Sequence, residues 1–440
     1  MQRALSFDAS PPLTVPLRFL VTAPLFMLLA AAALFWAGPQ ALHSRWSGSV
    51  LALTHLAVIG GLANAMTGAL LQILPVATGI RAVATQLTAW VVHGCISLGA
   101  LLLAIAFWQV SPPLFSSALI LLTIGLLWLT IAVLYGAWRD RAHATKGSPT
   151  ILLAVRLAVI ALAITVLFGI TLAGSMALGR PLPRSLTNLH AAWGLLGWVG
   201  LLVMGISYQV IPMFQVTERY PNFITRWLAL ITFIILGVLT ANNLLAWEGQ
   251  REANWFIASA LLAAYLVYAA VTFDLLRGRK RPKPDTTTLF WRSALASLGL
   301  CLPVWLLQIV GVGDFSVLLG ILFIVGFAWS AVNGMLYKIL PFLLWYNTQR
   351  DLMVALPAVP KVKQFLPDEQ VRPQVYAHWL AIALLVLASL WPTWFSSVAA
   401  IAFAVSVLWL MVHIRQGLRL YLRAQTDIAI ALAQRHQSHE

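Results

Sequence analysis

Two histidines in apolar surroundings have the residue type and the spacing to share a metal. Each lies upstream of a motif that occurs three times, at Gly68–Pro75, Gly205–Pro212 and Gly334–Pro341. In every copy Gly and Pro stand seven residues apart, and Gln or Lys stands three residues before Pro. His55 lies 20 residues before the Pro of its copy, and His190 lies 22 before its own. Imidazole nitrogen is a usual ligand of copper and of haem iron, so matching placement predicts one shared cofactor site.

The third copy of the motif has no such histidine. Leu319 and Ile321 occupy the matching offsets, and Lys338 replaces the Gln of the other copies. The repeated segments therefore offer two imidazoles at most. An ionisable side chain within lipid is a functional hypothesis by default, because its burial is costly without a partner.

A plainer interpretation applies to any single histidine, which can simply hydrogen-bond a neighbouring helix or lie among lipid headgroups. His93 lies deeper, about 15 Å below His55 at the helical rise per residue, and is kept as a weaker candidate metal ligand. The remaining six are expected in loops, in the C-terminal tail or near the cytoplasmic ends of spans: His43, His143, His378, His413, His436 and His439.

The composition requires a membrane protein. Hydrophobic residues make up 61% of the 440 residues, charged residues only 9%, and the mean hydropathy is +0.87. Twelve segments are long enough to cross a bilayer as helices of about 20 residues. They are 17–37, 50–75, 84–109, 114–137, 150–177, 187–212, 224–246, 253–275, 288–311, 315–343, 376–394 and 396–421.

Lysine and arginine set the expected orientation. With both termini in the cytoplasm, 21 of them fall on the cytoplasmic side and 4 on the other, as the positive-inside rule requires. This explains the net charge of +15 without nucleic acid as a partner. We expect a multi-pass protein of the bacterial-type cytoplasmic membrane, with a cytoplasmic loop over residues 344–375. The N-terminus does not resemble a cleavable signal, since Asp8, Pro11 and Pro12 precede the first span.

The motif copies define three units within a single transmembrane domain, 1–440. They fall in spans 2, 6 and 10, so the repeats are four-helix units at about 17–137, 150–275 and 288–421. Units with an even number of spans are parallel and are related by an axis along the membrane normal. The sequence thus predicts twelve helices in three arcs about a pseudo-threefold axis.

Glycines near the two histidines admit two interpretations. Gly60 and Gly68 in span 2, and Gly194 in span 6, could present open faces to a large planar cofactor. Small residues also serve close helix packing in lipid, and the sequence does not separate the two.

Other chemistry is disfavoured. Asp274 and Asp314 stand at helix ends, and no acidic residue lies at the middle of a span, which argues against a proton-coupled pump. Cys95 and Cys301 both lie inside apolar segments, so neither a disulfide framework nor a thiolate cluster is expected.

Twelve spans in three arcs, with His55 and His190 near the outer face of spans 2 and 6, resemble the core subunit of haem–copper oxidases and nitric-oxide reductases. The spacing of His55, Gly60, Gly68 and Pro75 is closer still to the NnrS family, haem- and copper-containing membrane proteins linked to nitric-oxide stress. The resemblance implies haem ligation by His55 and metal ligation by His190.

The departures exclude a complete oxygen-reducing centre. Those oxidases carry two histidines on span 10 and a histidine pair on span 7, whereas 315–343 and 224–246 contain none. We therefore expect haem or copper near the periplasmic face, with a redox or nitric-oxide-related role and a small gas as ligand, and no proton pumping. The alternatives are a cofactor-free permease and an assembly partner of respiratory-chain proteins, which would use the cationic cluster Arg277 to Lys283.

Overall fold

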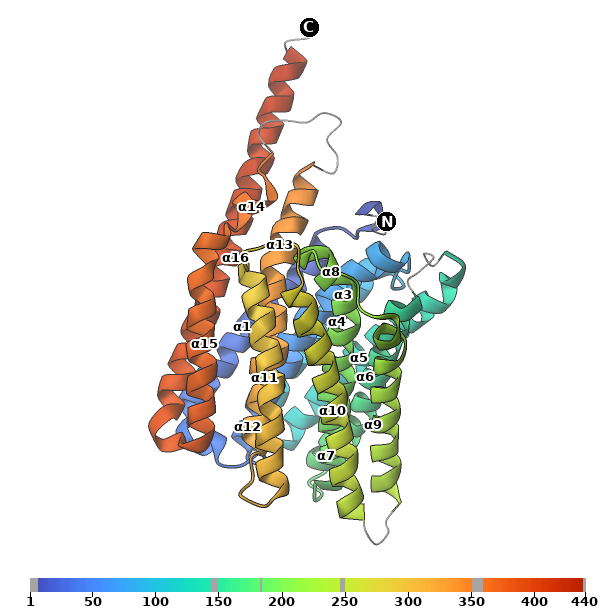
Figure 1. Ribbon diagram of the computed structural model, residues 1–440, viewed down its shortest axis with the longest axis vertical. Coiled ribbons are helices and arrows are strands. Elements are labelled where there is room, and N and C mark those ends of the chain that lie inside the picture. Colours follow the sequence, from blue (N-terminus) through green and yellow to red (C-terminus); the bar gives the residue numbers. More distant parts are fainter. Residues whose placement is uncertain (1–6, 144–148, 183, 246–249, 350–358, 438–440) are drawn as a thin grey trace.

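The computed structural model describes residues 7–143, 149–182, 184–245, 250–349 and 359–437, and all regular structure in these ranges is helical (Figure 1). Twelve helices in these ranges are long and apolar enough to cross a membrane, and each coincides with a predicted span. The prediction of an all-α chain is confirmed, as is that of twelve helices long and apolar enough to span a membrane, in the part of the chain that the structure describes. In chain order the spans are α1 (Thr14–Ala37) with η2 (Gly38–Leu42); α2 (Gly48–His55), η3 (Leu56–Ala63) and α3 (Asn64–Thr78); α4 (Thr85–Gln109); α5 (Pro112–Arg139); α6 (Pro149–Ala177); α7 (Arg184–Ala191), η5 (Ala192–Gly200) and α8 (Leu201–Gln215); η6 (Ile224–Leu228) and α9 (Ala229–Leu244); α10 (Gln250–Arg277); α11 (Thr286–Ile309); α12 (Ser316–Ile321), η7 (Leu322–Trp329) and α13 (Ser330–Gln349); α15 (Asp368–Leu390); and α16 (Pro392–Gln437).

Both ends of the chain lie at one end of the bundle, here named the terminal end, and α7 and α12 lie at the opposite end (Figure 1). The predicted loop 344–375 is largely helical where it is described, because α13 continues to Gln349, α14 covers Val362–Phe365 and α15 begins at Asp368. The last helix, α16, runs for 46 residues and extends well past residue 421. Basic residues end its apolar run but not the helix, since Lys and Arg are good helix formers.

The spans that carry the repeated motif share an unusual backbone. Spans 2, 6 and 10, here called the inner spans, each contain a π-helical segment, which is η3, η5 and η7 respectively. Each segment ends 12 residues before the Pro of its motif copy. π-helical turns are rare and are frequent at functional sites. A fourth π-helical segment, η6, begins span 7, so the inner spans are distinguished by the shared register of η3, η5 and η7 and not by π-helical structure alone.

The inner spans also share their packing. Each inner span has two glycines, eight residues apart, that face the first helix of the same predicted unit. The two residues of that first helix which the glycines contact are seven residues apart. A Cβ built on any of these glycines lies within 3.0 Å of that helix, so the absence of a side chain permits the approach. The pairs are Gly60 on Phe26 and Gly68 on Phe19 of α1, Gly197 on Ala161 and Gly205 on Ala154 of α6, and Gly326 on Ser297 and Gly334 on Phe290 of α11.

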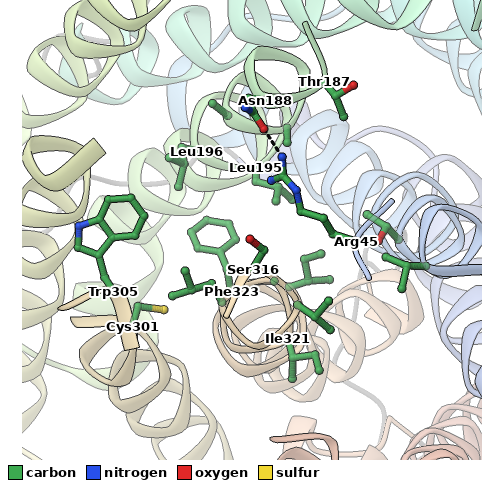
Figure 2. Close-up of a pocket in the computed structure, with 18 of the residues that line it drawn as sticks. Arg45, Thr187, Asn188, Leu195, Leu196, Cys301, Trp305, Ser316, Ile321 and Phe323 are labelled. Carbon is green, nitrogen blue, oxygen red and sulfur yellow. Dashed lines mark hydrogen bonds between the residues drawn. The ribbon is translucent and has the colours of Figure 1, made fainter. Parts of the chain in front are cut away.

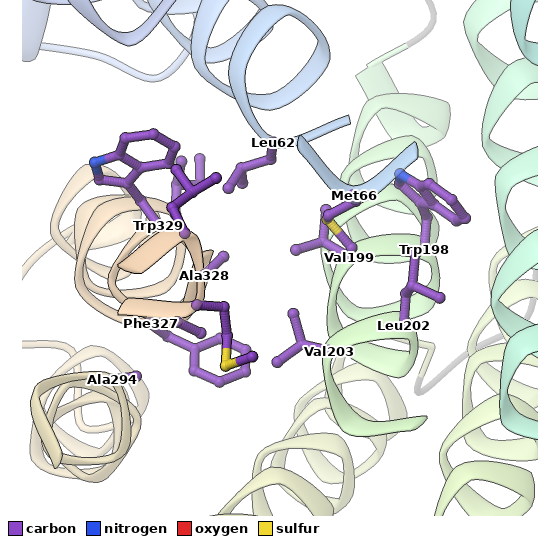
Figure 3. Close-up of a cluster of buried hydrophobic side chains, with 14 of the residues drawn as sticks. Leu62, Met66, Trp198, Val199, Leu202, Val203, Ala294, Phe327, Ala328 and Trp329 are labelled. Carbon is purple, nitrogen blue, oxygen red and sulfur yellow. The ribbon is translucent and has the colours of Figure 1, made fainter. Parts of the chain in front are cut away.

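The other spans surround the inner ones. Between 61 and 78% of the most apolar stretch of each inner span is buried, against 33 to 56% for the rest. Helix α5 packs on α6, α10 packs on α11, and α16 packs back on α1, which closes the ring. Leu62, Met66, Val199, Val203 and Phe327 fill the space between the inner spans (Figure 3). The rotation axis and the haem–copper-oxidase-like arrangement of the arcs stay predictions.

Candidate functional site

The structure brings His55 and His190 together near the opposite end of the bundle. Their ring centroids are 6.2 Å apart and the ring planes are inclined by 23°. His55 is the last residue of α2, and His190 is the last but one of α7, so each stands just before the π-helical segment of its span. The two residues that the sequence singled out therefore face one another across two separate spans.

His55 is held from two sides. The side chain of Ser47 accepts a hydrogen bond from the Val50 amide at 3.1 Å and caps the start of α2. One turn later, Nδ1 of His55 lies 2.7 Å from the carbonyl oxygen of Leu51. The ring of Phe107 in α4 lies 5.2 Å from the imidazole. These contacts fix the ring orientation before any ligand is considered.

His190 is held by the neighbouring helix α6. Its Nδ1 lies 3.0 Å from the carbonyl oxygen of Thr165. Gly169 leaves room for the ring, because a Cβ at that position would lie 3.2 Å from Cε1 of His190. Gly194 lets η5 approach α6 at the same level, since its own Cβ would lie 3.2 Å from Cγ2 of Thr165.

These contacts determine the protonation of both rings. A carbonyl oxygen can only accept, so Nδ1 of each imidazole must carry the hydrogen that it donates. In the neutral ring Nε2 then keeps an unshared electron pair. Nε2 of His55 and of His190 has no hydrogen-bond partner among the residues that the structure describes. Metal-binding histidines usually show this pattern, with the non-ligating nitrogen donating to a carbonyl or carboxylate.

The separation of the pair is of the size that a bridging ion requires. Metal–nitrogen bonds of about 2.0 Å, opposed across one ion, would place two imidazole centres about 6 Å apart; the observed centroids are 6.2 Å apart, with the rings stacked at 23°. Within the described ranges, no group of three or more His, Cys, Asp or Glu side chains is arranged to hold a metal. The pair therefore offers two nitrogen donors from the protein.

The three glycines named as candidate faces for a macrocycle lie at close helix contacts, and haem binding stays a prediction. The space above Gly60 is filled by Phe26, whose Cδ1 would lie 2.0 Å from an added Cβ. Gly68 lies against Phe19 and Gly194 against Thr165. The same glycines that could expose a flat surface instead bring helices into contact, which is the other use of small residues in lipid.

His93, the third predicted metal ligand, has different partners. Its Nε2 lies 2.9 Å from Oγ1 of Thr22, and its ring meets Phe19 edge-on at 5.2 Å. Its Nε2 is thus hydrogen-bonded to a hydroxyl, and its role as a metal ligand stays a prediction.

Two histidines were placed wrongly by the sequence analysis. His378 is fully buried, with Nε2 2.8 Å from Oγ of Ser330 and its ring 5.3 Å from that of Phe290. His413 is 4% exposed and lies 2.9 Å from the hydroxyl of Tyr337. Both side chains, expected near the cytoplasmic ends of their spans, are buried and hydrogen-bonded between helices. The clue in the sequence is that His378 has an apolar residue two or three positions away on either side.

A large cavity, which the sequence analysis did not find, lies between the inner spans toward the opposite end (Figure 2). Its volume is about 870 Å³, and α9, α10 and α11 complete its wall. Thr54, Ala57 and Ala191 line it, but among its described lining residues neither imidazole appears. The histidine pair and the cavity therefore use different faces of the same helices.

The mouth of the cavity carries one cation and one anion. The guanidinium of Arg45 donates to the side-chain oxygen of Asn188 (Figure 2). Burial lowers the pKa of Arg45, and the negative charge of Asp314 partly offsets this effect. Asp314 accepts hydrogen bonds from the side chain and the backbone amide of Ser316, which hold its pKa below the usual value.

No protein-family model matches the chain, and no curated protein matches it at a significant level. The resemblance to the haem–copper oxidases and to the NnrS family thus rests on the span count and on His55, Gly60, Gly68 and Pro75. It stays a prediction.

Proposed function

We propose that this polytopic membrane protein binds a single copper ion, as Cu(I), between His55 and His190. One observation carries the proposal: two imidazoles on separate inner spans stand 6.2 Å apart, and the Nδ1 of each is held by a backbone carbonyl. The two carbonyl contacts hold the rings, and neither Nε2 has a hydrogen-bond partner among the described residues, which supports a role for these atoms as ligands. Such preorganisation of the supporting contacts is typical of metal sites.

The charge of the ion argues for copper in its monovalent state. Both donors are neutral, and taking an ion from water into an apolar site costs several kcal/mol unless opposite charge compensates. A monovalent ion needs less compensation than Zn²⁺, Fe²⁺ or Cu²⁺. Imidazole is a suitable ligand for copper, and Cu(I) can be held by two nitrogen donors while still accepting a further ligand.

Copper with two protein ligands leaves positions for a small neutral molecule. A role in handling a gas such as nitric oxide is the part of the sequence-based prediction that this site can serve. An oxidase is not proposed, because η6–α9 and α12–η7–α13 lack the histidines of an oxygen-reducing centre. The charge distribution supports a cytoplasmic terminal end, which would put the copper site near the periplasmic face.

The experiment is a Cu(I) titration of the detergent-purified chain against a coloured competing chelator. We expect one ion per chain, with affinity reduced at least a hundredfold in His55→Ala and in His190→Ala. His93→Gln is the matched control, since this half-buried histidine has Nε2 hydrogen-bonded to Thr22, and its affinity should equal that of the wild type.

Two results would contradict the proposal. Copper binding that survives loss of either imidazole would place the ion elsewhere. A Soret band in the purified protein that disappears in His55→Ala would show that the site holds haem, against the packing around Gly60 and Gly194.

A further inference from the structure

We propose that the central cavity binds a single-chain amphiphile with an anionic head, of the kind represented by a long-chain carboxylate. The head would lie on Arg45 and Asn188, and the chain would extend along the apolar wall between the inner spans. This site is separate from the histidine pair and does not depend on the copper proposal.

The size and the wall of the cavity set the apolar part of the ligand. A volume of about 870 Å³ lies within the range of small-molecule sites, about 300–1,000 Å³. Most of the lining is apolar, and Leu195, Leu196 and Phe323 project into the region shown in Figure 2. An apolar chain gains free energy in proportion to the surface that it removes from water. In a membrane such chains are abundant.

The charged groups at the mouth set the head. Arg45 is half-buried and contacts an amide oxygen and the ring of Trp46, whose centroid is 4.4 Å away. Among the described residues no carboxylate lies within 4.0 Å of this guanidinium. The negative charge of Asp314 raises the pKa of Arg45, but the Asp314 carboxylate is hydrogen-bonded to Ser316 and not to the guanidinium. The cation at the mouth is therefore the charge that lacks a direct counter-ion.

A guanidinium pairs best with a flat, two-oxygen anion. Its parallel N–H groups match the geometry of a carboxylate or a phosphate, and such charge-assisted hydrogen bonds are about twice as strong as neutral ones. Only some of the five donors of Arg45 can be used by one oxygen of Asn188. Figure 2 shows Arg45 reaching to Asn188 on one side of the cavity, with Cys301 and Trp305 on the other. The polar and apolar parts of the ligand would thus be separated along the cavity.

The test uses the full chain in nanodiscs of zwitterionic lipid and a fluorescent polyene fatty acid as the probe. We expect saturable binding that falls about tenfold or more in Arg45→Gln, as loss of a charge-assisted contact predicts, and that is largely kept in Arg45→Lys. Gly320→Phe should abolish binding, because Gly320 lines the cavity and has no atom within 4 Å of an added Cβ, so the new ring fills the ligand space. Arg180→Gln, an exposed cation outside the cavity lining, is the matched control and should bind as wild type.

Three comparisons decide the outcome. Displacement of the probe by unlabelled fatty acid, but not by its methyl ester, supports the anionic head; equal displacement by both overturns it. Displacement by phosphatidylglycerol in place of fatty acid would assign the head to a two-chain phospholipid and overturn the single-chain ligand. His55→Ala should leave probe binding unchanged, so that failure of the copper site and failure of this site are distinguished.

Discussion

The histidines of this protein fall into two arrangements that differ in which ring nitrogen the protein holds. In His55 and His190, Nδ1 is bound to a backbone carbonyl, at 2.7 and 3.0 Å. In His93 and His378, Nε2 is bound to a hydroxyl, of Thr22 at 2.9 Å and of Ser330 at 2.8 Å. The rings of His55 and His190, which belong to two different spans, stack on one another. The rings of His93 and His378 each contact a phenylalanine in the first helix of their own predicted unit.

The comparison teaches that burial alone does not identify a ligand. His378 is the most buried of the four, yet its Nε2 is used in packing span 11 against span 10. The phenylalanines that it and His93 contact, Phe290 and Phe19, occupy matching positions beneath Gly334 and Gly68. This second arrangement is thus a recurring structural contact, and the first is the one for which copper binding is proposed.

The largest effect on stability is expected at His378. His378→Ala removes a fully buried ring and its hydrogen bond with the hydroxyl of Ser330, which keeps only its bond to the carbonyl oxygen of Val325, so the free energy of unfolding should fall by about 2–4 kcal/mol. Denaturation by SDS in mixed micelles would measure it. His190→Ala should cost less stability and lose copper. Loss of copper binding in a folded His378→Ala variant would contradict the structural role assigned to His378.

The second prediction concerns the glycines of span 2. Gly60→Ala places a methyl group 2.0 Å from the ring of Phe26, which is 4% exposed and cannot move freely. We expect a loss of about 1–3 kcal/mol in unfolding free energy. Gly320→Ala, where nothing lies within 4 Å, should be neutral or slightly stabilising because Ala favours the helix. Equal effects at both positions would show that Gly60 is not at a close helix contact.

The third prediction separates the support of the copper site from its ligands. Gly169→Ala brings a methyl group to 3.2 Å from His190 and should turn the ring, which weakens Cu(I) binding about tenfold, as for other supporting contacts. Gly174→Ala in the same helix α6 is the control, since nothing lies within 4 Å of its added Cβ. The measurement is the same chelator titration. An unchanged affinity in Gly169→Ala would mean that the ring orientation is not critical.

The smallest effect is expected where the third motif copy departs from the others. Lys338 forms an ion pair of 2.7 Å with Asp285, the residue that caps α11. Burial alone would raise the pKa of Asp285, but Lys338 and Thr288 lower it overall. A lowered pKa stabilises the fold above the unfolded-state value of about 3.9, and this contribution is lost as the pH falls through the folded-state pKa.

Asp285→Asn should therefore reduce the free energy of unfolding by about 1 kcal/mol at pH 7 and should differ less from wild type near pH 3. Unfolding midpoints measured from pH 7 to pH 3 would test this. Glu218→Gln removes an exposed ion pair with Lys280 and should change little. A deficit in Asp285→Asn that is constant with pH would contradict the assigned ion pair.

The sequence predicted the spans well because the apolar runs are long and are bounded by charge or Pro. It also predicted that His55 and His190 would meet, since the repeat offsets place them at one depth. The sequence could not predict that a side chain fills the space beside Gly60, because that side chain, Phe26, belongs to another helix. It placed His378 near the cytoplasmic end of span 11 and could not predict its burial, because its partner Ser330 lies on another span.

The cavity was invisible for a related reason. Arg45 lies in the connection before α2, Asn188 in the short helix α7 and Ser316 at the start of α12. These places are far apart in the chain, and each residue alone resembles an ordinary polar residue near a helix end. The length of α16 was predicted too short, because hydropathy indicates where the membrane-spanning part ends and not where the helix ends.

The central claim is that two imidazoles alone supply the protein ligands to one copper ion. X-ray absorption at the copper edge of the Cu(I)-loaded chain tests it most directly. We predict two nitrogen neighbours at about 2.0 Å, with a spectrum that is lost in His190→Ala and kept in His93→Gln. A spectrum dominated by sulfur ligands, or one that persists without His190, would contradict it.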